Sequence, residues 1–172
     1  LVPHKQVEHA IDAALALRAR HPDLRLHVVG SGWWEAELHA YAAQRGAGDT
    51  VVFEGHVDER RKHEVYEQAW VLGLPSLKEG LPNVVLEAMA CGLPCVAARA
   101  SGSRELIREG ETGYTYAHGD VTEMGEALRR CLSAEGGRLG RNAREVAQTQ
   151  YSIQVIADRY EALYEQLLMQ HR

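Results

Sequence analysis

The chain has 172 residues, of which 45% are apolar and 25% charged, and its net charge is −5. This length suits about one domain, which can bury roughly 70% of the surface that the unfolded chain exposes. The negative charge gives nucleic acid no general attraction, so no nucleic-acid partner is expected. No apolar run approaches the roughly 18 residues of a membrane-spanning helix, although peripheral contact with a membrane stays open.

Three cysteines, Cys91, Cys95 and Cys131, are too few and wrongly spaced for a zinc ribbon or a CxxC redox pair. Two of them lie in an apolar segment, which favours buried, unreactive thiols. Their odd number fits a reducing compartment best. We therefore expect a cytoplasmic location, or one peripheral to the inner face of the membrane.

Predicted strands and helices alternate with short links over most of the chain. Continuous apolar runs predict strands at Leu24–Val29, Val51–Phe53, Trp70–Leu74, Pro94–Ala98 and Tyr114–Ala117. Apolar periodicity and capping residues predict helices at Val7–Arg20, Trp33–Arg45, Asp58–Ala69, within Glu79–Gly92, at Glu105–Arg108, from Asp120 or Thr122 to Ser133, at Arg138–Gln150 and at Ile153–Gln170. The alternating order of strands and helices favours parallel βαβ units. Strands that are apolar at every position are typical of a sheet covered by helices on both faces. We predict one Rossmann-like α/β domain over residues 1–172.

Four turns follow predicted strands: Gly30-Ser31-Gly32, Gly55-His56-Val57, Pro75–Asn83 and Arg99–Glu105. The carboxyl ends of parallel strands meet at one edge of a sheet, where helix N-termini point amides at anionic ligands. We expect these turns to line that edge. Gly30 and Gly32 alone are not a dinucleotide fingerprint, because Glu35 stands where the third glycine of G-x-G-x-x-G would fall. A tight turn into a helix explains the two glycines equally well.

The segment Glu79–Gly92, EGLPNVVLEAMACG, joins a polar turn to a short apolar helix. Glu79 lies in the turn, before a helix that begins near Pro82 or Asn83, since proline is favourable at a first helical position. The first amides of that helix have no partner inside it and carry partial positive charge. The segment therefore presents a carboxylate and free amides at the expected ligand-binding edge.

Glu87 lies about one turn inside this helix, on a segment that is apolar nearly all round. A carboxylate in such a place is costly unless it is hydrogen-bonded. The hydroxyls of a ribose would satisfy it, since a carboxylate can accept two hydrogen bonds at once. The alternative is that Glu87 caps the helix or forms an internal salt bridge.

The segment Glu79–Gly92, with Leu93–Ala97 after it, resembles the E-x7-E segment in the C-terminal half of GT-B glycosyltransferases of the retaining family 4. Further matches are Lys5, Val29–Gly32, Val52–Gly55, Pro75-Ser76, Gly102–Ile107, Gly110–Gly113 and the closing helices with Tyr160 and Tyr164. The resemblance thus covers nearly the whole chain. It implies the C-terminal, donor-binding half of a GT-B fold, a Rossmann-like parallel sheet with helices on both faces.

The resemblance implies a role for each matched residue. Glu79 would contact hydroxyls of the donor sugar near the reacting centre, and Lys5 would neutralise the diphosphate that leaves with the nucleotide. Glu87 would hold the ribose. The other residues implied in binding the nucleotide sugar are Gly80, Leu81, Pro82, Asn83 and Val84, through backbone amides, Gly30 and Gly32, and His56 and Val57 near the base.

The predicted function is transfer of a hexosyl group, with retention, from a nucleoside-diphosphate sugar such as a UDP- or GDP-sugar to a glycan, lipid or small acceptor. The donor is a substrate. No cofactor or metal is expected, because a lysine at the diphosphate would make a metal unnecessary. Three alternatives stay open: a GT-B nucleotide-sugar epimerase, a non-catalytic nucleotide-sugar-binding module, and a flavodoxin-like interaction domain that binds no nucleotide.

The sequence departs from the family's pattern in three places. The arginine that normally works with Lys5 would fall before Leu1, and Gln6 replaces the usual glycine. Leu81-Pro82 replaces a frequent Phe-Gly pair, as in some polysaccharide-assembling members. The family's N-terminal domain, which carries the acceptor site, is not within these residues. We therefore expect a fragment that needs this domain as a partner, binds nucleotide weakly and transfers no sugar alone.

Overall fold

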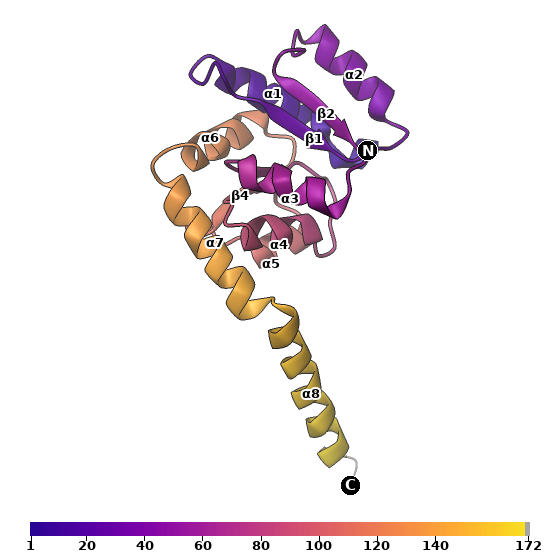
Figure 1. Ribbon diagram of the computed structural model, residues 1–172, viewed down its shortest axis with the longest axis vertical. Helices are drawn as coiled ribbons and strands as arrows, with labels where there is room; N and C mark the ends of the chain where they lie inside the picture. Colours follow the sequence, from indigo (N-terminus) through magenta and orange to yellow (C-terminus); the bar gives the residue numbers. More distant parts are fainter. Residues whose placement is uncertain (171–172) are drawn as a thin grey trace.

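The computed structural model describes residues 1–170, which form an α/β structure (Figure 1). In chain order the elements are the 3-10 helix η1 (Pro3–Lys5), α1 (Val7–Arg18), β1 (Leu26–Val29), α2 (Glu35–Gln44), β2 (Val51–Gly55), α3 (Glu59–Gln68), β3 (Leu72–Leu74), α4 (Asn83–Ala90), β4 (Cys95–Ala98), α5 (Ser101–Leu106), β5 (Gly113–Tyr116), α6 (Val121–Cys131), α7 (Gly136–Gln150) and α8 (Ile153–Gln170). The alternation of strands and helices predicted from the sequence is confirmed.

The five strands described are all parallel, and they form two hydrogen-bonded sheets. β1 pairs with β2, with Leu26 opposite Val51, while β4 lies between β3 and β5. Within residues 1–170 no strand pairing joins β1 to β3, so the single predicted sheet is divided there. All four residues of β4 are buried, as predicted for a strand with helices on both faces.

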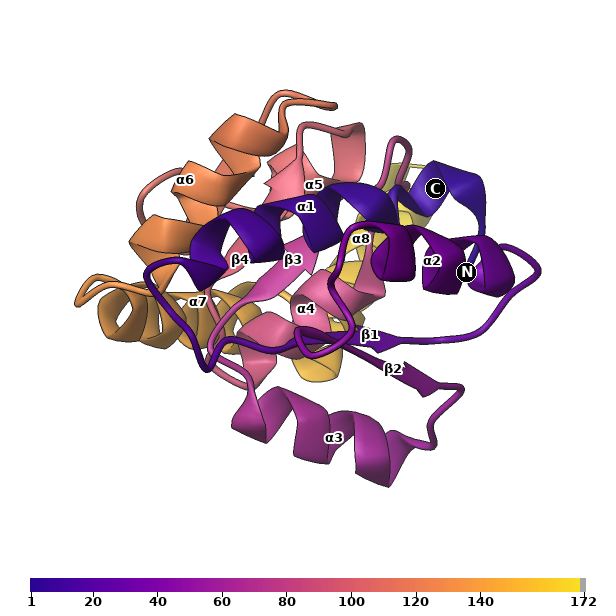
Figure 2. The same cartoon turned by 90° about the horizontal axis from the view of Figure 1, so that it is seen from above.

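Helices pack on the strands, and three apolar clusters fill the space between them. Figure 2 shows α1 and α3 on opposite sides of β1 and β2. Ile11 of α1 packs with Val28 and Val51 of the β1–β2 sheet. Its neighbour Ala10 faces a second cluster, which includes Val96 of β4. Because α1 contributes to both clusters, it holds the two sheets together.

Capping and turn residues define several helix ends where the sequence predicts them. Asp58 accepts a hydrogen bond from the amide of Arg61 at 2.7 Å at the start of α3. Asp120 accepts one from the amide of Glu123 at 2.8 Å at the start of α6. Gly46 follows α2 with a φ of 67°, in the left-handed region that glycine adopts without strain.

One predicted helix is displaced. The helix predicted at Glu105–Arg108 is α5, which begins earlier, at Ser101, and ends at Leu106. The reason is tertiary: Gly102 lies so close to the carbonyl of Gly80 that any Cβ would overlap it. This packing holds the segment in a helix despite the low helix propensity of glycine.

The last helix, α8, extends away from the rest of the molecule (Figure 1). None of its residues is buried. Its exposed large apolar side chains are Ile153, Tyr160, Leu163, Tyr164, Leu167, Leu168 and Met169. Among residues 1–170, no helix has both the length and the apolar character needed to cross a membrane.

Two helical glycines should respond oppositely to alanine. A Cβ on Gly140 of α7 would overlap the carbonyl oxygen of Gly92, whereas a Cβ on Gly125 of α6 meets nothing within 4 Å. Gly140→Ala should lower the free energy of unfolding by about 1–3 kcal/mol through overpacking. Gly125→Ala should raise it by about 0.5–1 kcal/mol, because alanine is the better helix former. Urea unfolding followed by circular dichroism measures both, and equal effects would contradict the packing of α7 on Gly92.

Candidate functional site

The predicted ligand-binding edge lies at the carboxyl ends of the strands. Gly30 follows β1 and Gly55 ends β2, and the amide of Gly30 donates a hydrogen bond to the carbonyl of Gly55 at 2.7 Å. The turn after β3 and the segment after β4 also meet, because Gly102 packs against Gly80. The structure thus brings the four predicted turns together in two pairs, one pair at each sheet.

An ion pair joins the two residues implied in catalysis. The ammonium Nζ of Lys5 donates a hydrogen bond to Oε1 of Glu79 at 2.8 Å, although the two residues are 74 positions apart. The backbone brings them together, because the amide of Leu77 donates to the carbonyl of His4 at 2.9 Å and attaches the turn after β3 to η1. Gln6 then adopts the left-handed conformation, with a φ of 52°, between η1 and α1.

The environment of Glu79 keeps its carboxyl ionised. Its side chain is 13% exposed, whereas that of Lys5 is 40% exposed. Burial acts to raise the pKa of the Glu79 carboxyl. The hydrogen bonds from Lys5 and Ser76, together with the charges of Lys5 and His4, outweigh burial, and the pKa lies below its ordinary value. Glu79 is therefore a carboxylate at neutral pH, beside a cation that remains accessible from solvent.

The turn before α4 leaves backbone amides open. α4 begins at Asn83, as predicted, and no side chain caps its N-terminus. Between Gly80 and Val84, where this turn meets the start of α4, the exposed residues are Gly80, Leu81, Asn83 and Val84. Pro82 is buried and has no amide hydrogen. It shapes the turn but cannot donate to a ligand, which corrects the amide role predicted for it.

Glu87 lies on α4 and faces α3. Its Oε2 accepts a hydrogen bond from the hydroxyl of Tyr66 at 3.0 Å and lies 3.2 Å from Nζ of Lys62. Its side chain is 37% exposed, so it is not the buried carboxylate that the apolar character of the helix indicates. The internal salt bridge named as the alternative is present, and a role for Glu87 toward a ribose stays a prediction.

Lys62 and Tyr66 are the partners that sequence reasoning missed. They stand four residues apart on α3, so their side chains share one face of the helix. Lys62 lies among many other charged residues, and its spacing does not distinguish it from them. The available signal was an aromatic residue, Tyr66, one turn after a lysine on an otherwise charged helix.

The other predicted nucleotide-binding residues follow β1 and β2. Gly30 has a φ of 116°, and Gly32 lies against the backbone of Leu1, which a Cβ would overlap. Backbone geometry therefore requires both glycines, in agreement with the prediction of a tight turn at Gly30 and Gly32. His56 is exposed and Val57 half-buried, just beyond β2. Their position near a base stays a prediction.

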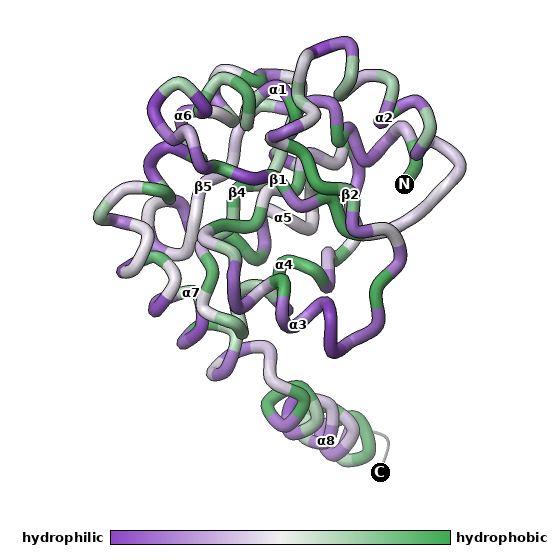
Figure 3. Tube along the Cα trace, turned by 45° about the horizontal axis from the view of Figure 1, so that its top comes forward, coloured by the Kyte–Doolittle hydropathy of each residue, from purple (hydrophilic) through white to green (hydrophobic). Residues whose placement is uncertain are grey.

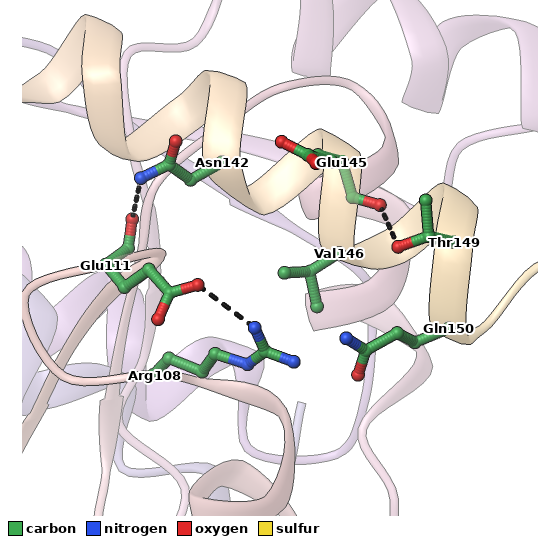
Figure 4. Close-up of a pocket in the computed structure, with 7 residues that line it drawn as sticks. All are labelled: Arg108, Glu111, Asn142, Glu145, Val146, Thr149 and Gln150. Carbon is green, nitrogen blue, oxygen red and sulfur yellow. Dashed lines mark hydrogen bonds and ion pairs between the residues drawn. The ribbon is translucent and has the colours of Figure 1, made fainter.

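A small cavity lies elsewhere, between α7 and the turn that follows α5 (Figure 4). Its volume is about 190 Å³, below the roughly 300 Å³ at which ligand pockets begin. Polar groups around it satisfy one another: Arg108 pairs with Glu111 at 3.0 Å, and Asn142 donates to the carbonyl of Glu111 at 3.0 Å. This cavity is a gap in the packing between α7 and that turn.

Within residues 1–170, no three His, Cys, Asp or Glu side chains gather as a metal ion would require.

Comparison with known proteins identifies the family. Residues 1–150 match the family model described as glycosyl transferases group 1. The chain belongs to this family. This group 1 glycosyl transferase domain is 34% identical over 172 residues to an exopolysaccharide phosphotransferase of Streptomyces coelicolor, a match that covers 98% of the chain and 18% of that protein.

Solved structures related to this group 1 glycosyl transferase domain have the GT-B fold. Sucrose-phosphate synthase of Thermosynechococcus elongatus superposes with a TM-score of 0.85 at 28% identity, over 98% of the chain and 43% of that protein. HepE of Anabaena, solved in complex with UDP, superposes with a TM-score of 0.84 at 25% identity, over 96% and 46%. The chain spans less than half the length of the curated relatives that it matches. The predicted α/β architecture and the prediction of a glycosyltransferase are confirmed, and the family shown is glycosyl transferases group 1.

The pKa of Glu79 should make stability depend on pH in a defined window. Its folded pKa lies below the unfolded value of about 4.3. Ionised Glu79 therefore stabilises the fold above that value, and this stabilisation is lost as the pH falls through the folded pKa. The free energy of unfolding of the wild type should fall more steeply than that of Glu79→Gln between about pH 5 and pH 3.

Urea unfolding at a series of pH values tests this expectation. Glu161→Gln, on the exposed helix α8, is the control and should follow the wild type. Parallel curves for the wild type and Glu79→Gln would contradict the ion pair between Lys5 and Glu79.

Proposed function

We propose that the chain is the donor-binding, C-terminal domain of a retaining family 4 glycosyltransferase that transfers a hexosyl group from a nucleoside-diphosphate sugar. The observation that carries this proposal is the Lys5–Glu79 ion pair beside the uncapped N-terminus of α4. A cation, a carboxylate and free amides are the groups that a diphosphate and a sugar need. The UDP bound to HepE of Anabaena supports a nucleotide as the ligand.

The donor would lie along the carboxyl edge of the strands. Its diphosphate would meet the first amides of α4, which carry partial positive charge. Lys5 would leave Glu79 and pair with the diphosphate, and Glu79 would accept hydrogen bonds from the sugar. Glu87 would accept hydrogen bonds from the ribose, with His56 and Val57 near the base. Each part of the donor would then have a partner of matching chemistry.

The charge that grows on the leaving nucleotide is the main demand of the reaction. Transfer breaks the bond between the anomeric carbon of the sugar and the diphosphate oxygen, and the electron pair of that bond stays on the diphosphate. Lys5 and the amides of α4 would stabilise this charge as it develops. Glu79 would orient the sugar through its hydroxyls. The donor is a substrate in this proposal, and neither cofactor nor metal takes part.

A second domain would supply the acceptor side. The proposed partner is the N-terminal domain of a longer protein, because the curated relatives are more than twice as long as the match. The apolar side chains that α8 exposes suit an additional packing surface for that domain. The acceptor would be a glycan, lipid or small molecule, and the exopolysaccharide relative favours polysaccharide assembly. The proposed location is the cytoplasm or the inner face of the membrane.

Removal of Glu87 should weaken nucleotide binding. Calorimetric titration of UDP, GDP and ADP, free and as sugar conjugates, compares the wild type with Glu87→Ala. Loss of a charged hydrogen-bonding partner should cost about 1.5–3 kcal/mol, or roughly 10- to 150-fold in affinity. Glu126→Ala is the matched control, because it breaks an exposed ion pair with Arg129 on α6.

The control should bind nucleotide as the wild type does. Equal affinities of the wild type and Glu87→Ala would remove Glu87 from the site. Binding of no nucleotide at all would favour the flavodoxin-like interaction domain over the proposed function.

The isolated 172-residue chain should bind the donor and transfer no sugar, because the acceptor domain is not part of it. Assays with labelled UDP- and GDP-sugars and a panel of glycan and lipid acceptors test this, with the longer protein as positive control. Robust transfer by the isolated chain would contradict the need for a second domain. Binding without transfer by the longer protein would favour a non-catalytic module, and interconversion of the donor sugar would indicate an epimerase.

A further inference from the structure

Helix α3 borders Glu87 and is placed largely by polar contacts. None of its residues is buried, and Figure 3 shows hydrophilic residues along most of its trace. On one side, Arg61 donates to both carboxylate oxygens of Glu54 on β2, at 3.1 and 3.0 Å. On the other side, Lys62 and Tyr66 meet Glu87 of α4. α3 therefore holds one carboxylate on each side, and only Glu87 belongs to the candidate site.

The two donors of α3 converge on the same oxygen of Glu87. The hydroxyl of Tyr66 lies 3.0 Å and Nζ of Lys62 lies 3.2 Å from Oε2. No hydrogen bond from the described residues 1–170 reaches the other oxygen, Oε1. This arrangement fixes the plane of a carboxylate that is 37% exposed and leaves one of its oxygens available to a ligand.

Tyr66 is the more rigid of the two donors. Its ring packs against an apolar cluster that includes Val85 and Met89 of α4. Burial raises the pKa of Tyr66, and the charge of Glu87 raises it further, so its hydroxyl remains a donor near neutral pH. Lys62 is shared, because its Nζ also pairs with Glu59 at 3.0 Å.

We infer that Tyr66 is a positioning residue, which orients the carboxylate of Glu87 toward the ribose hydroxyls of the donor, with Lys62 in support. The inference rests on the proposed function, because it assumes that a nucleotide binds at Glu87. Pre-organisation is the physical reason: a partly exposed glutamate without a fixed partner must give up rotamer freedom when it binds a ligand. Tyr66 removes that freedom in advance and touches no part of the donor itself.

The test compares two ligands that differ only at the ribose. The nucleoside diphosphate that binds most tightly among UDP, GDP and ADP is titrated beside its 2′,3′-dideoxy analogue, by NMR so that weak binding is measurable. Tyr66→Phe removes the hydroxyl and keeps the ring in its apolar cluster. Tyr41→Phe is the matched control, because the Tyr41 hydroxyl donates to Asp12 at 2.7 Å in the contact between α2 and α1.

Tyr66→Phe should lower affinity for the normal nucleotide about 3- to 10-fold, as expected for one hydrogen bond. It should leave affinity for the dideoxy analogue unchanged, because that analogue offers Glu87 no hydroxyl. Tyr41→Phe should change neither affinity. In a Glu87→Ala background, Tyr66→Phe should cause no further loss of affinity. In the wild type, Lys62→Met should cause a smaller loss of affinity than Tyr66→Phe does, and Lys62→Arg should retain the wild-type affinity.

Several outcomes would overturn the inference. Unchanged affinity in Tyr66→Phe would show that Glu87 needs no orienting hydroxyl. An equal loss for both ligands would assign Tyr66 a structural role, which thermal unfolding of the variant would register as well. If the wild type binds the normal nucleotide no better than the dideoxy analogue, or binds neither, the proposed role of Glu87 toward the ribose fails first. That result concerns the wild type, so it can be told apart from a result in which only the positioning role of Tyr66 fails.

Discussion

A partly buried carboxylate needs a counter-charge, and this requirement shapes both the fold and the candidate site around Glu79. Glu79 is mostly covered, and Lys5 is the cation that meets it, from a segment 74 positions earlier in the chain. Their contact attaches η1 to the turn after β3, and so connects the N-terminal part of the chain to the second sheet. A covered carboxylate without such a partner would be destabilising. The ion pair thus helps to place the turn that opens α4.

Both glutamates of the E-x7-E segment form ion pairs with cations of the protein. Glu79 pairs with Lys5, and Glu87 pairs with Lys62 and accepts from Tyr66. Under the proposed function, the donor exchanges part of these contacts for its own. Its diphosphate takes Lys5 from Glu79, and the sugar hydroxyls replace Lys5. Because these contacts would be exchanged and not simply added, net affinity should be modest.

The parts of the structure that depend on neighbouring residues could be predicted from the sequence. The caps Asp58 and Asp120 and the start of α4 at Asn83 follow from local hydrogen bonding and backbone preference. The division into two sheets could not, because it depends on which strand edges meet. The early start of α5 depends on the contact of Gly102 with a distant turn. In the site, the family resemblance assigned Lys5 to the diphosphate and Glu79 to the sugar of one donor, but it did not predict their ion pair. The role of Tyr66 likewise emerges only when α3 and α4 are seen side by side.

Under the proposed function, the Lys5–Glu79 ion pair opens to receive a nucleoside-diphosphate sugar. A crystal structure of the chain with an intact donor sugar tests it most directly. In that structure, Nζ of Lys5 should lie within hydrogen-bonding distance of the diphosphate, with Glu79 on a sugar hydroxyl and Glu87 on the ribose. A donor bound elsewhere, with the Lys5–Glu79 pair intact, would contradict it.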